Sequence, residues 1–112
     1  MGWWHWMLRW AEGVDLETLA NRLVKNSQEA VWQRVQSRIV DMSLAEARGY
    51  VRARSVGIIE TGVGSLSTGY ALSHDEIEQL AEMCMERLTK WAISESLEAS
   101  RKRRYSQRRL AA

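Results

Sequence analysis

An unbroken helical spacing of apolar residues near the carboxyl end constrains the fold more than any other feature of the sequence. No proline occurs between Ser73 and about Arg109, and apolar side chains recur there every three or four residues, the spacing that lines one face of an α-helix. Ser73 and Glu76 have the positions of a capping box, which satisfies N–H groups of a helical first turn. We therefore predict one helix over residues 73–109, with an apolar face made of Ile77, Leu80, Ala81, Cys84, Leu88, Trp91 and Ala92.

This predicted helix is longer than the domain that can surround it. At ~1.5 Å per residue it spans ~55 Å. This length exceeds the width of a compact domain of ~100 residues, whose radius of gyration is only ~13 Å. The whole chain has 112 residues, enough for one hydrophobic core. We expect the first half of the helix to be buried and its basic second half to extend beyond the core.

Two short helices are predicted before this long one. Asp15 is a suitable N-cap, and apolar residues follow it at helical spacing as far as Val24. The polar residues Asn26 and Ser27 interrupt this stripe, so we expect a turn there. Ser27 would then cap a second helix that runs to Met42.

A further helix is predicted to begin at Leu44, because Ser43 and Glu46 form a second capping box. It is expected to run to about Glu60, although residues 56–63 also fit a short strand. The glycine-rich stretch 62–69 predicts a flexible loop. The sequence thus predicts an all-α bundle of four to five helices whose core contains Leu19, Leu23, Val31, Val35, Ile39, Leu44, Val51, Ile77, Leu80, Cys84, Leu88 and Trp91.

The first ten residues, MGWWHWMLRW, contain four of the six tryptophans in the chain. In a helix over residues 1–12, Trp3, Trp6 and Trp10 share one face and Trp4 lies beside it. Each Trp buries on the order of 200 Å² when covered, so four exposed ones would form an unusually large apolar patch. Three outcomes stay open: this helix folds back onto the core, docks on a partner protein, or inserts at a membrane interface. We treat Trp3, Trp4, Trp6 and Trp10 as a candidate protein interface.

Positive charge is concentrated at the carboxyl end. Residues 101–109 contain six cations and no acid, whereas the net charge of the whole chain is +2, so the other residues together carry −4. We therefore divide the chain into a single helical domain, residues 1–100, and a basic extension, residues 101–112. The candidate contacts to phosphates or to an acidic partner are Arg101, Lys102, Arg103, Arg104, Tyr105, Arg108 and Arg109.

The segment LETLANRLVKNSQEAVWQRV, residues 16–35, resembles a helix-turn-helix. The polar residues around Ser27 stand where that motif has its turn, although the turn is one residue longer than usual. Lys25 also replaces the usual apolar turn residue. The resemblance implies DNA binding through the amino-terminal residues of the second helix, which here are Ser27, Gln28, Glu29 and Gln33.

The sequence contains no pattern that predicts catalysis, a cofactor or a metal site. The lone Cys84 excludes an internal disulfide and a zinc site built from several cysteines. Because Cys84 lies between Leu80 and Leu88 on the apolar face, we expect a buried structural thiol. His74 is expected in the solvated first turn of the long helix. We therefore expect no enzymatic activity, no cofactor and no metal.

Two functions fit these observations. The first is a non-enzymatic interaction module, oligomeric or a subunit of a larger assembly, in which the Trp-rich face contacts protein and the basic tail contacts an acidic surface, including that of another copy. The alternative is a DNA- or RNA-binding protein that uses residues 16–35 and the basic tail. No apolar run approaches the ~18–20 residues that a membrane span requires, so we expect a cytoplasmic protein without a transmembrane segment.

Overall fold

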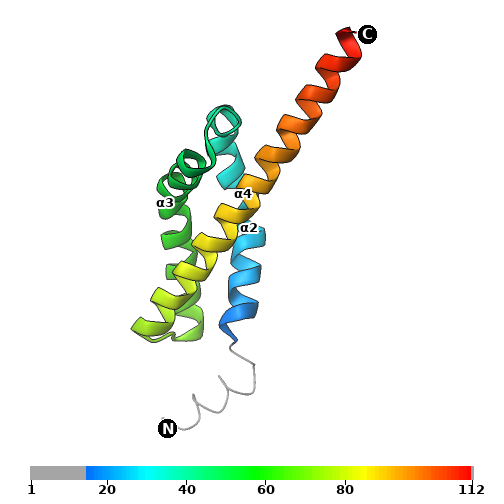
Figure 1. Ribbon diagram of the computed structural model, residues 1–112. Helices are drawn as coiled ribbons and strands as arrows, with labels where there is room; N and C mark the ends of the chain where they lie inside the picture. Colours follow the sequence, from blue (N-terminus) through cyan, green and yellow to red (C-terminus); the bar gives the residue numbers. More distant parts are fainter. Residues whose placement is uncertain (1–14, 112) are drawn as a thin grey trace, which may run out of the picture.

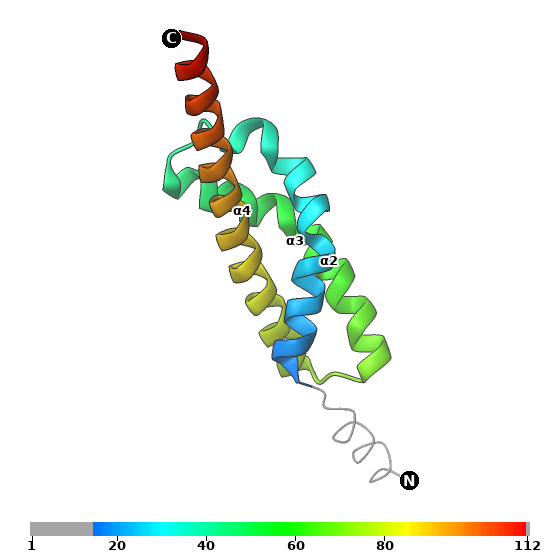
Figure 2. The ribbon, with the colours of Figure 1, turned by 90° about the vertical axis from the view of Figure 1, so that its right-hand side faces the viewer.

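Three helices make up the part of the chain that the structure describes, residues 15–111 of a computed structural model. They are α2 (Leu16–Ile39), α3 (Leu44–Tyr70) and α4 (His74–Ala111). Helices α2 and α4 run in the same direction and α3 runs against them, which gives an up-down-up bundle (Figures 1 and 2). The all-α class is confirmed. The predicted helix over residues 1–12, with its four tryptophans, lies outside the described residues.

Each helix begins at the residue that the capping patterns predict. Asp15 accepts a hydrogen bond from the backbone N–H of Glu17 at 3.1 Å. The Ser43 hydroxyl accepts from the N–H of Glu46 at 3.3 Å. At the start of α4, the Glu76 N–H donates to the Ser73 hydroxyl at 3.2 Å, and the Ser73 N–H donates to the Glu76 carboxylate at 2.9 Å. These bonds satisfy N–H groups that a helix leaves without a partner.

The turn predicted at Asn26 and Ser27 does not form, and this is one reason why the described helices number three rather than four to five. Helix α2 is continuous over 24 residues. Ser27 is only 5% exposed and belongs to the same buried face as Leu23 and Val31. Burial of this face along the whole helix outweighs the weak local preference of Asn and Ser for a turn.

The glycine-rich stretch 62–69 is also helical, so the predicted loop is wrong, and residues 56–63 are helix rather than strand. Helix α3 ends at Tyr70, and Ala71 follows it in the left-handed conformation with φ 51°. Val63 is 3% exposed and continues the buried stripe of α3. A Cβ added at Gly62 would overlap Cδ1 of Leu23, so this glycine allows α3 to approach α2 closely.

The core is close to the predicted one. Nine of the twelve predicted residues are buried, and Ile77 and Trp91 are partly buried. Trp91 packs edge-to-face on Trp32 with their ring centroids 6.1 Å apart. Leu44 is 55% exposed, contrary to prediction, because it is the first residue of α3 at an end of the bundle. The sequence reading missed Ser55, which is fully buried.

Helix α4 is unbroken over 38 residues and extends beyond the other two helices (Figure 1). It has 11 residues more than α3, which corresponds to ~16 Å of additional helix. The described part of the chain measures 72 × 23 × 18 Å. The predicted mismatch between the long helix and its body is therefore confirmed. No helix within residues 15–111 has both the length and the apolarity of a membrane span.

Two glycines of α3 provide a matched test of this packing. Gly64→Ala should raise the free energy of unfolding by about 1 kcal/mol, because a Cβ there meets no atom within 4 Å. Gly62→Ala should lower it by about 1–3 kcal/mol, because the Leu23 side chain must move. Urea denaturation followed by circular dichroism measures both. Equal stabilisation by the two substitutions would show that α3 does not approach α2 at Gly62.

Candidate functional site

The cationic segment of α4, residues 101–111, stands outside the core of the bundle. Ser96, at 8% exposure, is the last buried residue of α4. All six cations between Arg101 and Arg109 are exposed, and Tyr105 is 65% exposed. In Figure 1 this segment is the orange-to-red end of α4 that projects past α2 and α3. The predicted basic extension is therefore a continuation of the last core helix.

Most of these cations share one face of the helix. Successive residues of an α-helix are rotated by ~100°, which places Arg103 on the side that faces the bundle. There it contacts Asp41, in the connection between α2 and α3, at 3.7 Å. The other five cations and Tyr105 fall within an outward arc of about 160°: Arg101, Lys102, Arg104, Tyr105, Arg108 and Arg109.

Few acids offset this positive charge. Arg101 pairs with Glu98 at 3.5 Å, whereas Arg104, Arg108 and Arg109 form no ion pair with the described residues. No acidic residue follows Glu98 in the chain. Cations near a helix carboxyl end also complement its macrodipole, so the helix itself tolerates their accumulation. The result is a positive surface of the kind that attracts polyanions and acidic proteins.

The opposite end of the bundle is acidic. The starts of α2 and α4 lie together at the lower end of Figure 1, and the cationic segment lies at the upper end. The sequence assigns a net charge of −4 to residues other than 101–109, and much of this charge is at that lower end. Its acids are Asp15, Glu17, Asp75, Glu76, Glu78 and Glu82.

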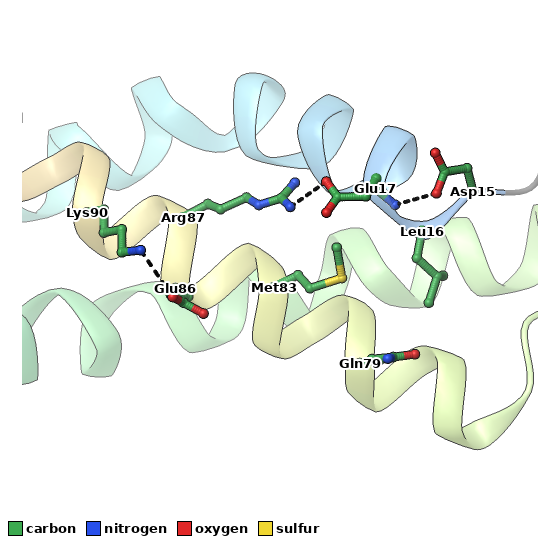
Figure 3. Close-up of a pocket in the computed structure, with 8 residues that line it drawn as sticks. All are labelled: Asp15, Leu16, Glu17, Gln79, Met83, Glu86, Arg87 and Lys90. Atoms are coloured by element: carbon green, nitrogen blue, oxygen red, sulfur yellow. Dashed lines mark hydrogen bonds and ion pairs between the residues drawn. The ribbon is translucent and has the colours of Figure 1, made fainter.

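A groove of about 560 Å³ separates the start of α2 from α4 (Figure 3). Arg87 crosses it and donates to Glu17 at 2.5 Å and to Asn21 at 2.6 Å. Lys90 pairs with Glu86 at 3.2 Å on its border. Both cations are thus paired with acids of the same chain. The contacts of Arg87 hold α2 against α4, and the groove offers little unpaired charge to a ligand.

Cys84 is buried in the core, as predicted, and its thiol is 3.9 Å from the carbonyl oxygen of Ala20. Burial raises the pKa of the thiol from 9.0 to about 11, against the opposing effect of the Arg87 charge. The thiol is therefore protonated at neutral pH and is not a nucleophile.

His74 has a partner that the sequence reading overlooked. Its Nε2 lies 3.1 Å from the carboxylate of Glu78, four residues further along α4. Both side chains are strongly exposed, at 83% and 69%, so this is a solvated pair in the first turns of the helix. Within residues 15–111 there is no group of three or more side chains suited to hold a metal ion.

The arrangement implied by the helix-turn-helix resemblance does not form. Because α2 is continuous, Ser27, Gln28 and Gln33 do not lie at the start of a second helix. Ser27 is buried, Gln28 is half-buried and Gln33 is exposed. These three residues are therefore not arranged as in a helix-turn-helix, where the start of the second helix contacts the DNA bases.

Comparison of the chain with protein-family models, with curated proteins and with solved structures finds no match.

The state of the Cys84 thiol can be tested through its reactivity and through stability. At pH 8, iodoacetamide should label native Cys84 at least ~100-fold more slowly than the unfolded chain, since a pKa two units higher leaves ~100-fold less thiolate. Because the pKa is raised in the folded state, the contribution of the Cys84 thiol to the free energy of unfolding is fully present below pH 9.0. It is lost as the pH rises towards 11. Cys84→Ala should reduce this alkaline loss. Equal labelling rates in the two states would contradict a buried, protonated thiol.

Proposed function

We propose that this protein is a non-enzymatic interaction module whose cationic segment binds an acidic protein surface, as one subunit of an assembly. The observation that supports this most strongly is the set of exposed arginines, Arg104, Arg108 and Arg109, on a projecting helix. They form no ion pair with the described residues, and no acid follows Glu98. A helical segment that is formed before binding also loses little conformational entropy when a partner docks.

A binding role suits the titratable groups of the bundle better than a catalytic one. The acids and bases that line the groove of Figure 3 include the Arg87–Glu17 and Lys90–Glu86 ion pairs. The sole thiol is protonated at neutral pH because burial raises its pKa. A nucleophile or general base requires a group whose pKa lies near the working pH and that can reach substrate.

Nucleic-acid binding is the second candidate, and the placement of Tyr105 favours it. This ring is 65% exposed and lies within the same outward arc as Arg101 and Arg108. Arginines that contact phosphates, with an aromatic ring between them on which a base stacks, are typical of surfaces that bind single strands. The tryptophans of residues 1–12 stay a predicted protein interface.

We expect a polyanionic peptide to bind the cationic segment and not the other exposed cations of the protein. The probe is a fluorescein-labelled polyglutamate peptide, titrated with full-length protein at low salt and followed by anisotropy. Neutralising Arg104, Arg108 and Arg109 to Gln should weaken binding about 10-fold or more, as each exposed charge contact contributes up to ~1 kcal/mol. The matched control neutralises Lys25, Arg38 and Arg54, three exposed cations of the bundle, and should change affinity less than ~2-fold.

No binding by the native protein, or equal weakening in the two variants, would contradict the proposal. A short DNA duplex and a single-stranded RNA, added as competitors, test the second candidate. If either displaces the peptide at far lower concentration than polyglutamate does, nucleic acid is the preferred partner. For the DNA duplex, the slope of log affinity against log salt concentration should then be smaller in the Arg-to-Gln variant, by ~0.9 for each phosphate contact that is lost.

A further inference from the structure

One exposed line of side chains runs along α4 and changes sign at its middle. Its members are spaced three or four residues apart and average about 3.7 residues per step, close to one helical turn. They therefore form a nearly straight line ~50 Å long. We call this line the α4 stripe: Asp75, Glu78, Glu82, Glu86, Lys90, Ser94, Leu97, Arg101, Arg104 and Arg108, all of them exposed.

The sign pattern of the α4 stripe matches itself when a second copy is laid against it in the opposite direction. In an antiparallel pair about a two-fold axis near residues 91 and 92, residue i of one copy faces residue 183 − i of its partner. Asp75 then faces Arg108 and Glu82 faces Arg101. Glu78 lies one residue away from the position that faces Arg104, a displacement of ~1.5 Å.

Symmetry repeats each of these pairs, because in a two-fold interface residue i contacts j and j contacts i. Three kinds of pair thus give six ion pairs at the two ends of the interface. In a parallel arrangement the acids of one stripe would instead face the acids of the other. The charge pattern therefore favours one relative orientation of two copies and opposes the other.

The middle of the stripe supplies the apolar contact that charged ends alone lack. Leu97 is 63% exposed and in this register faces Glu86 of the partner. Beside Glu86 lies a second groove of about 560 Å³, which is lined by Ile93 and otherwise by polar or charged residues, among them Arg52, Thr89 and Lys90. An exposed leucine beside this groove gives the interface one apolar contact per copy near the symmetry axis, within a charged border.

The ion pairs within one copy do not prevent this arrangement. Glu82 contacts Arg52 at 3.3 Å and Arg101 contacts Glu98 at 3.5 Å. The side chains of these pairs are 47–78% exposed, and such exposed pairs contribute ~0–1 kcal/mol each. They can be exchanged for contacts with a second copy at little cost. The Lys90 charge near the axis is already neutralised by Glu86 at 3.2 Å.

From this pattern we infer that the acidic surface bound by the cationic segment is the first half of α4 in a second copy of the chain. The inference rests on the proposed function, since it names the partner of the same segment. A strip ~50 Å long and ~10 Å wide buries about 1,000 Å² in total, the lower end of specific interfaces. The antiparallel dimer is therefore weak and reversible.

Sedimentation of the full-length chain provides the first test. At about 50 mM salt, the weight-average mass should rise from 12.9 kDa towards twice that value as the concentration increases from about 5 to 200 µM. At about 500 mM salt it should stay at the monomer value, because exposed ion pairs are screened. A monomer at all concentrations and low salt overturns the inference.

Charge exchange tests whether the two charged ends of the α4 stripe form the contact. One variant changes Arg101, Arg104 and Arg108 to Glu, and the other changes Asp75, Glu78 and Glu82 to Arg. Each variant alone should be monomeric, because its stripe has one sign at both ends. An equimolar mixture should form a heterodimer, because every facing pair is again of opposite sign. Circular dichroism of each variant verifies that it is helical, and a mixture of two helical variants that does not associate overturns the inference.

Cross-linking tests the orientation and the register without reversing any charge. An equimolar mixture of Glu82→Cys and Arg101→Cys should form a mixed disulfide under mild oxidation, because the two positions face each other. Either variant alone is the matched control, since its cysteines lie ~28 Å apart along the axis and a disulfide needs Cα atoms within ~7 Å. The native Cys84 is buried and does not compete. Equal cross-linking in the single variants and the mixture contradicts the register.

These outcomes separate the inference from the proposed function. If polyglutamate binds through the cationic segment but the chain stays monomeric, the proposed function stands and the second copy is not the partner. Association that persists at high salt and in both charge variants is due to other surfaces, and it also overturns the inference.

Discussion

The structure depends on the burial of one face of α4 by α2 and α3. Leu80 and Leu88 are fully buried on this face, and each contributes about 1.5–3 kcal/mol relative to an exposed side chain. Once these turns are fixed, the helix continues at low cost, because nucleation is the unfavourable step. The cationic segment is helical for this reason, although the side chains of residues 101–110 are all exposed. Packing in the first half of α4 therefore determines the form of the exposed second half.

The same helix explains why charge is separated along the molecule. An acidic first turn and a basic last turn both complement the helix macrodipole, and Asp75 and Arg108 follow this rule at the two ends of α4. In a helix of ordinary length the effect would be local. Here the two ends are 33 residues apart in the chain, or ~50 Å in space. The molecule thus presents two surfaces of opposite sign that cannot neutralise each other within one copy, and the proposal of a second copy as partner rests on this separation.

The sequence predicted the features that depend on local chemistry and strong periodicity. Asp15, Ser43 and Ser73 cap helices as expected, and α4 has nearly the predicted bounds. The errors arose where tertiary packing overrides local preference. Ser27 reads as a cap but is buried in mid-helix, and Gly62 reads as a loop residue but allows contact with Leu23. The basic residues of the candidate site could be identified from the sequence alone. Which of them face outward, and that Arg103 faces the bundle instead, follows only once the helix is known to be continuous.

The central claim, that α4 is one straight helix with an exposed cationic end, is tested most directly by a distance between two points on it. Gln79 and Gln107 are both exposed and can be changed to cysteine and spin-labelled, with measurement by pulsed electron paramagnetic resonance at high salt. A continuous helix predicts a narrow distribution centred near ~42 Å. A broad distribution, or one centred far below this value, would contradict the account, because the cationic segment would then be frayed or folded back on the bundle.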